Sequence, residues 1–253
     1  MRKRRVAVLI SGAGSNMAAL IDAGLAPDTA FEVVLAVSNI ANAGGLAVAE
    51  AKGVAVQTIP HAAFGRDRAG FVMAAGGAAI LLESEESARA RGADASTVLS
   101  GYGVTSDAHH ATAPHPDGAG ARRAMALALA DAGLAPEAVD YVNAHGTSTE
   151  YNDRTELAAL DHVLGEHARR VPISSTKSMT GHMIGAAGVV EAMFCVQAMR
   201  DGVVPPTINL DDPEFPEFDL VPHRSRPAQL TAALSNSFGF GGHNASVILE
   251  RAA

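Results

Sequence analysis

The amino-acid sequence predicts an α/β protein in which a short parallel fragment precedes a larger mixed sheet layered with helices. Three observations favour this fold class. Apolar strand-like runs alternate with helix-like segments, glycines separate many of these segments, and apolar residues make up 48% of the 253 residues against 18% charged residues. A chain of this composition can bury a core, because it lacks the low hydrophobicity that is typical of disorder.

The first sixty residues predict a Rossmann-like parallel βαβαβ fragment. Three short apolar runs alternate with two helical segments, in the order 6–10, 17–23, 33–37, 46–51 and 54–59. Short links between such elements favour parallel strands joined by right-handed crossovers. We therefore expect a first domain at residues 1–63.

A second domain is expected at residues 64–253. Strands are predicted at 71–83, 97–104, 139–144, 172–175, 232–238 and 245–250, and helices at 84–90, 118–132, 153–164 and 183–199. The last of these helices is mostly apolar, so we expect it to lie buried. Residues 205–227 are rich in Pro and Asp and are expected to be mostly irregular.

Charge and composition exclude several classes of protein. Asp and Glu outnumber Lys and Arg by 27 to 19, which argues against a broad nucleic-acid surface. The basic start at residues 2–5 precedes only five apolar residues, fewer than the ~7–15 of a signal-peptide core. The longest uncharged stretch, 228–249, contains glycines and many polar side chains, so no membrane span is expected. The single cysteine favours a reducing, cytoplasmic location.

A glycine-rich loop follows the first predicted strand, with the sequence Ser11-Gly12-Ala13-Gly14-Ser15-Asn16. Small residues at a helix N-terminus favour a bound phosphate, and the same spacing equally suits a tight turn without a ligand. The third glycine of a dinucleotide fingerprint is absent, and no Gly-Lys-Ser/Thr follows, so neither a dinucleotide loop nor a Walker loop is predicted.

This loop, together with Val37-Ser38-Asn39, resembles phosphoribosylglycinamide formyltransferase of purine synthesis over roughly residues 5–64. The resemblance implies that Gly14, Ser15 and Asn16 hold a ribose phosphate. The catalytic Asn-x-His-Pro motif of that family is absent. Its nearest equivalent is Asn143-Ala144-His145, where Gly146 replaces the proline.

Three polar loops of the second domain hold groups suited to chemistry, at residues 143–149, 174–182 and 235–244. His145 follows a predicted strand, and His182 precedes the apolar helix. The positive end of that helix and Lys177 disfavour a protonated His182, so we expect a neutral hydrogen-bond donor. Each loop alone also suits an ordinary structural role. The histidine spacings do not predict a metal site.

The order of the three loops is similar to the C-terminal half of the β-ketoacyl-acyl-carrier-protein synthases, especially the type II form, whose fold is thiolase-like. The similarity begins at Phe64-Gly65-Arg66-Asp67-Arg68-Ala69-Gly70-Phe71-Val72-Met73 and covers about three quarters of this chain. It departs at Gly65, Ala69 and Ala75, where that family tends to have acids.

The resemblance implies a decarboxylative condensation, in which malonyl-carrier protein loses carbon dioxide and its enolate attacks an acyl thioester. His145 and His182 match two histidines that hydrogen-bond the thioester oxygen, where negative charge develops. Lys177 matches the lysine that orders the second histidine, and Glu191 matches its partner.

Other positions match the substrate-binding groups of that family. Thr147 and Thr149 match hydroxyls that hold the pantetheine arm, Phe240 matches a gating phenylalanine, and Phe238 packs behind it. The resemblance implies no resident cofactor, because the substrates are carried on the phosphopantetheine of acyl carrier protein, the expected partner.

The nucleophilic cysteine of that family belongs to its N-terminal half. Cys195 lies in the middle of the predicted apolar helix, where a free cysteine acts as a small hydrophobe. We therefore expect a chimera with an incomplete site, which self-associates or pairs with a ketosynthase chain through an exposed apolar face. Formyl transfer and a non-catalytic partner subunit of a ketosynthase are the alternatives.

Overall fold

The computed structural model describes residues 3–10, 15–27, 29, 31–38, 42–58, 70, 72–93 and 96–252, without the side chains of 4–7, 9, 10, 15 and 16. The chain divides into two compact units, Met1–Arg66 and Asp67–Ala253. The predicted domain boundary, between residues 63 and 64, lies outside the described residues. Each unit is described by itself.

The smaller unit is a three-stranded parallel sheet with two helices, and it confirms the predicted βαβαβ order. Its elements are β1 (Arg4–Ile10), α1 (Ser15–Leu25), β2 (Phe31–Ser38), α2 (Gly44–Ala51) and β3 (Ala55–Thr58). The strands lie in the order β1-β2-β3. Its buried core residues come from both helices, from β2 and from the residue before β3: Met17, Ile21, Ala36, Ala49 and Val54.

The larger unit is built around a mixed five-stranded sheet in the order β4-β10-β9-β5-β6. Strands β4, β10 and β9 are antiparallel, and β9, β5 and β6 are parallel. Its elements are α3 (Glu85–Ala90), β4 (Thr97–Ser106), α4 (Ala119–Ala132), η2 (Pro136–Ala138), β5 (Tyr141–Asn143), α5 (Glu150–Leu164), η3 (Gly165–Arg169), β6 (Ile173–Ser174), α6 (Lys177–Thr180), η4 (Ile184–Ala186), α7 (Ala187–Asp201), β7 (Val203–Val204), β8 (Arg226–Pro227), β9 (Ala232–Gly239) and β10 (His243–Arg251).

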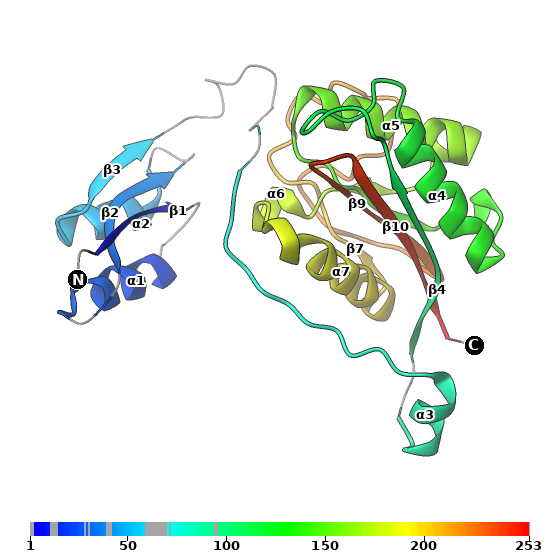
Figure 1. Ribbon diagram of the computed structural model, residues 1–253, viewed down its shortest axis with the longest axis horizontal. Helices are drawn as coiled ribbons and strands as arrows, with labels where there is room; N and C mark the ends of the chain where they lie inside the picture. Colours follow the sequence, from blue (N-terminus) through cyan, green and yellow to red (C-terminus); the bar gives the residue numbers. More distant parts are fainter. Residues whose placement is uncertain are drawn as a thin grey trace. The chain divides into compact units, whose positions relative to one another are not determined.

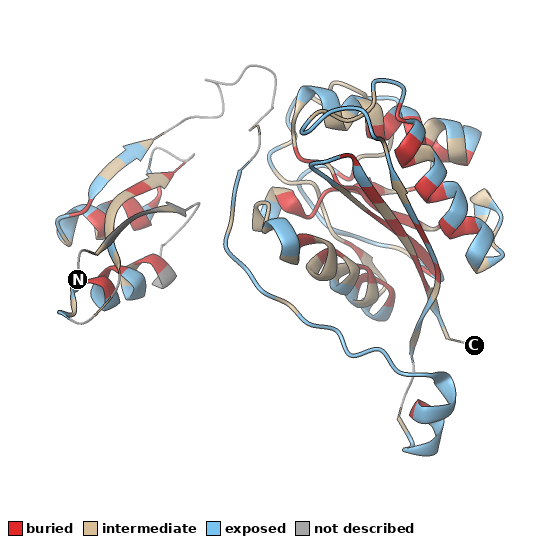
Figure 2. Cartoon of the chain, viewed as in Figure 1, coloured by how far each residue is buried: buried red, intermediate tan, exposed pale blue. Residues whose placement is uncertain are grey.

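Helices cover both faces of this sheet (Figure 1), with α4 and α5 on one face and α7 on the other. The period-two alternation of strand side chains divides the core accordingly. Val142 and Leu234 pack with α4 and α5, whereas their neighbours Tyr141 and Ala233 pack against α7. Buried residues follow the central strands in Figure 2. The strand ends between these two layers position the polar loops.

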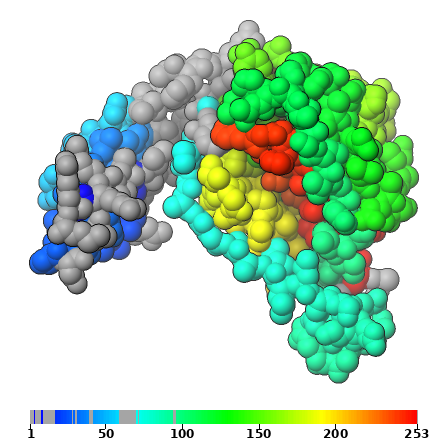
Figure 3. Space-filling model, in the orientation of Figure 1, coloured from blue at the N-terminus to red at the C-terminus, as the bar shows by residue number. Residues whose placement is uncertain are grey.

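The predicted strand at residues 71–83 is wrong. Residues 72–83 are extended, but within the described part of the chain their only ladder contact is the bridge from Met73 to His182. The segment lies on the surface, cyan in Figure 3, and Leu81 is 88% exposed. Its apolar sequence is typical of a strand, but no strand of the described residues runs beside it.

The predicted helix at 183–199 is only partly correct. The chain first makes the short turn η4, and the helix α7 begins at Ala187. One face of α7 is buried, whereas Met193 on another face is 47% exposed. The prediction of burial treated an apolar sequence as a buried one, although an apolar face without a neighbour stays exposed.

Residues 205–227 are irregular as predicted, apart from the pair β7–β8 that brackets them. Among the described residues, no helix combines the length and hydropathy that a membrane span requires.

Candidate active site

The first histidine loop leaves the C-terminal end of β5 and is held by a buried carboxylate. Glu156, on α5, is 2% exposed. One carboxylate oxygen accepts a hydrogen bond from the backbone N–H of His145, and the other accepts one from the backbone N–H of Gly146, each at 2.8 Å. The oxygen that binds His145 also accepts a hydrogen bond from Nδ2 of Asn236 at 3.1 Å. Burial raises the pKa of Glu156, and these hydrogen bonds partly oppose the rise. Helix α5 thus fixes the backbone from which His145 projects.

Glycine at position 146 lets this loop pack closely on its neighbour. Gly146 has φ +36°, and a Cβ there would lie 2.6 Å from the Cβ of Ser175. The hydroxyl of Ser175 donates to the carbonyl of Gly146 at 2.7 Å. A larger residue at 146 would therefore push the first histidine loop away from the second.

The second histidine loop follows α6 and passes close to the extended segment. Gly181 has φ +69°, and a Cβ there would lie 2.8 Å from the Cβ of Ala74. The backbone N–H of His182 donates a hydrogen bond to the carbonyl of Val72 at 2.7 Å, and its carbonyl accepts one from the N–H of Ala74 at 2.9 Å. These bonds fix the backbone of His182 beside the segment.

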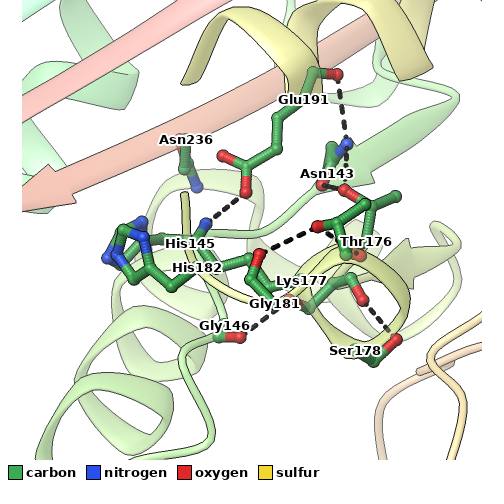
Figure 4. Close-up of polar contacts among 12 residues, drawn as sticks. Asn143, His145, Gly146, Thr176, Lys177, Ser178, Gly181, His182, Glu191 and Asn236 are labelled. Carbon is green, nitrogen blue, oxygen red and sulfur yellow. Dashed lines mark hydrogen bonds and ion pairs between the residues drawn. The ribbon is translucent and has the colours of Figure 1, made fainter. Parts of the chain in front are cut away.

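The structure brings the two predicted histidines together (Figure 4). The ring centroids of His145 and His182 lie 5.3 Å apart, with an angle of 81° between the ring planes. The ring of Phe238 packs on His145 at 5.7 Å. One small ligand group can therefore contact both imidazoles.

The hydrogen bonds indicate which nitrogen of His182 can donate. The backbone N–H of Ile184 donates to Nδ1 of His182 at 3.0 Å. An Nδ1 that accepts a hydrogen bond leaves the proton of a neutral ring on Nε2. Nδ1 of His145 is buried and has no hydrogen-bond partner among the described residues.

Both imidazoles are neutral near pH 7. Burial, with the nearby charge of Lys177, holds the pKa of His145 well below its usual value. Burial and Lys177 lower the pKa of His182 to about 4. A neutral imidazole can donate one hydrogen bond without carrying a charge of its own, which suits stabilisation of a developing oxyanion.

A buried ion pair lies behind the histidines (Figure 4). Nζ of Lys177 donates to a carboxylate oxygen of Glu191 on α7, and both side chains are buried. Burial raises the pKa of Glu191 to about 7, although Lys177 opposes the rise. The other carboxylate oxygen, Oε2, has no partner within the described residues. The ammonium group of Lys177 lies near both imidazoles and contributes to lowering their pKa values.

The predicted binding residues lie in the same loops. The hydroxyls of Thr147 and Thr149 are 2.9 Å apart, and Thr147 is buried. Phe240 is 65% exposed at the turn between β9 and β10. The structure therefore places these residues, whereas their roles toward a substrate stay predictions.

The predicted phosphate loop lies mostly outside the described residues. Gly14 lies outside the described residues, and the side chains of Ser15 and Asn16, at the start of α1, do so as well. The ribose-phosphate site therefore stays a prediction.

Cys195 is fully buried in α7. Burial raises the pKa of its thiol to about 12, so the thiolate is scarce at neutral pH. Within the described residues, no three His, Cys, Asp or Glu side chains are grouped as metal ligands. The site thus combines two neutral donors with a lysine, without an accessible thiol.

Glu156 and Asn236 were not predicted as site residues. Glu156 shares the buried stripe of α5 with Leu160 and Leu164, at spacings of four and eight residues. An acid on an apolar stripe is the signal that could have identified it, because a buried carboxylate needs several donors.

Residues 96–211 match the family model of the beta-ketoacyl synthase C-terminal domain, and residues 4–99 match that of the formyl transferases. Curated relatives include 3-oxoacyl-[acyl-carrier-protein] synthase 2 of Synechocystis sp., 54% identical over 190 residues, and that of Rhizobium meliloti, 53% identical over 186 residues. These alignments cover 74% and 73% of this chain but only 45% and 44% of the relatives.

Solved structures give the same result. A type II polyketide ketosynthase in complex with its acyl-carrier protein is 38% identical with a TM-score of 0.64, over 68% of this chain and 42% of that one. The ishigamide ketosynthase/chain length factor is 30% identical with a TM-score of 0.69, over 100% of this chain and 76% of that one. A beta-ketoacyl synthase of Burkholderia phymatum is 26% identical with a TM-score of 0.63, over 99% of this chain and 76% of that one.

The layered mixed sheet of the larger unit has a thiolase-like fold. The chain belongs to the β-ketoacyl synthase family. It spans less than half the length of the curated relatives it matches. Its front part matches a second family, so the predicted combination of two families in one chain is confirmed.

Proposed function

We propose that the larger unit provides the oxyanion-stabilising part of a β-ketoacyl-acyl-carrier-protein synthase site. In this proposal, His145 and His182 donate hydrogen bonds to the thioester oxygen of a malonyl group. The observation that carries it is the convergence of two neutral imidazoles at 5.3 Å, with the Nδ1 of His182 already occupied by a backbone donor. Such preorganised donors stabilise charge that develops during reaction.

The chemical step is loss of carbon dioxide. The bond between the malonyl carboxylate and the α-carbon breaks, and its electron pair moves into the enolate, whose charge lies on the thioester oxygen. The two imidazole N–H groups stabilise that oxygen, and a proton from water then adds to the α-carbon to give an acetyl thioester. No nucleophilic cysteine is needed for this half-reaction.

Carbon–carbon bond formation needs an acyl group on a cysteine, which Cys195 does not offer. We propose that a ketosynthase chain carrying that cysteine would supply it. One solved relative is a ketosynthase in complex with its chain length factor, which supports pairing between chains of this family.

The carrier of the substrate is acyl carrier protein in this proposal. The hydroxyls of Thr147 and Thr149, in the first histidine loop, would bind the pantetheine arm, and Phe240 would flank the entrance. The solved complex of a ketosynthase with its acyl-carrier protein supports this partner. We also propose a role in fatty-acid synthesis in the cytoplasm, and the same curated relatives support that role.

The test is release of carbon dioxide from malonyl-acyl-carrier protein by the purified chain. We expect His145→Ala to lower the rate about 100-fold, as loss of one oxyanion donor does elsewhere. The matched control is His162→Ala, which removes an exposed imidazole from α5. Equal rates for the wild type and His145→Ala would remove the assignment.

A further inference from the structure

Strand β4 leaves one edge of the five-stranded sheet without a strand partner among the described residues. The backbone N–H of Tyr102 points away from β10 and donates to Asp131 at 3.1 Å, whereas the N–H of Asp107 points toward the β10 side and donates to Gly242 at 2.8 Å. Because strand N–H groups alternate in direction, those of Val104 and Ser106 face the free edge. Such an edge can accept another strand.

A groove of about 470 Å³ lies beside this stretch of β4. Its walls come from residues 104–106 at the end of β4, from Asp107 and His115 in the loop that follows, and from α4, which runs alongside the strand in Figure 1. Val104 is 61% exposed, and Leu127 of α4 is 41% exposed. Arg123 lies in the same groove, and none of the ion pairs found among the described residues involves it. A groove between an edge strand and a helix is the geometry that binds extended peptides by strand addition.

The same chain carries an extended segment that suits this groove. Residues 79–82, Ala-Ile-Leu-Leu, form a continuous apolar run, and Leu81 and Leu82 are 88% and 67% exposed. A continuous apolar run is typical of a strand buried on both faces. Three acids follow it, at positions 83, 85 and 86.

We propose that segment 79–82 of one copy of this chain adds as a strand to the free edge of β4 in a second copy. One face of the added strand would pack on Leu127, and the other would lie beside the exposed Val104. Glu86, which forms no ion pair among the described residues, would complement Arg123 in the groove, whereas Glu83 and Glu85 already pair with Arg91 and Arg89. Reciprocal exchange of the two segments closes a two-fold dimer.

The experiment measures the solution mass of the full chain by light scattering across a dilution series. We expect a dimer, and we expect two variants to be monomeric, so that the mass halves. Leu81→Lys places a charge in the donor segment, and Val104→Pro removes an edge N–H at a position where an edge strand tolerates proline. The control Leu25→Lys, which changes a 69% exposed leucine of α1, should remain dimeric.

Mixing separates strand exchange from general apolar association. Each variant retains one intact partner surface, so an equimolar mixture of Leu81→Lys and Val104→Pro should regain a dimer with a single exchanged strand. Hydrogen exchange should show protection of the Val104 and Ser106 amides in the dimer and its loss on dilution. Neither readout involves decarboxylation, so this proposal and the histidine proposal fail separately.

Three results would overturn the proposal. These are a wild-type chain that is monomeric throughout the series, variants that still associate, or a mixture that stays monomeric. A further arm repeats hydrogen exchange after addition of the portion of the Synechocystis relative that this chain lacks. If the amides of residues 79–82 become protected only then, the segment binds that partner instead of a second copy.

Discussion

The carboxylate of Glu156 accepts the backbone N–H of His145 at 2.8 Å, and so connects the buried stripe of α5 to the first histidine loop. The same side chain accepts from Gly146 and from Asn236 on β9. Three elements of the larger unit therefore meet at one buried carboxylate. Its removal should disturb the fold and the site together.

We expect Glu156→Ala to lower the free energy of unfolding by about 3 kcal/mol, because it leaves three buried donors without an acceptor. Glu156→Gln retains one acceptor oxygen and should lose less. Urea unfolding followed by circular dichroism measures both. Equal stability of Glu156→Ala and the wild type would contradict the role of this carboxylate.

The Lys177–Glu191 pair should show the behaviour of buried ion pairs. Lys177→Met leaves the Glu191 carboxylate without its cation and should cost about 3–5 kcal/mol of stability. The double variant Lys177→Met/Glu191→Leu removes both buried charges and should recover part of that loss. Urea unfolding of the single and double variants tests this. A double variant less stable than Lys177→Met would be inconsistent with it.

The imidazole of His182 should stay neutral well below pH 6.5. Its pKa in the folded chain is about 4, whereas that of an unfolded histidine is about 6.5. A lowered pKa contributes stability that is fully present above about pH 6.5 and is lost as the pH falls toward 4. Nitrogen NMR of the labelled ring should report the titration near pH 4, with free histidine as the reference. A titration midpoint near pH 6.5 would contradict a lowered pKa of His182.

The thiol of Cys195 should not react in the folded chain. It is fully buried and its pKa is raised to about 12, and alkylation requires an accessible thiolate. Iodoacetamide labelling followed by mass spectrometry should show no adduct under native conditions and a complete adduct in denaturant. Rapid labelling of the folded chain would contradict this burial and would make Cys195 a candidate nucleophile.

Much of the fold could be predicted because the sequence pattern is local. The parallel order of the smaller unit follows from alternating runs, and strands β9 and β10 follow from apolar segments around a glycine turn. The prediction of a strand at residues 71–83 was wrong because a strand needs a neighbouring strand, and local sequence does not say whether one is present. The prediction that α7 is buried was partly wrong for a similar reason, because local sequence does not say which of its faces has a neighbour.

The site was predictable to a similar degree. Loop order and the family resemblance pointed to His145, His182, Lys177 and Glu191, and the structure brings these four side chains together. The support from Glu156 was not predicted, because it depends on a contact between residues eleven positions apart on different elements. The backbone donor to Nδ1 of His182 depends on the turn η4, which residue types alone do not specify.

In the proposed site, both imidazoles act on one acceptor atom. A double-mutant cycle on malonyl-acyl-carrier-protein decarboxylation, with His145→Ala, His182→Ala and the double variant, tests it most directly. We expect each single variant to lose about 100-fold in rate, and the double variant to lose clearly less than the product of the two losses, because coupled donors are not additive. Fully multiplicative losses, or a single variant with the wild-type rate, would contradict the claim.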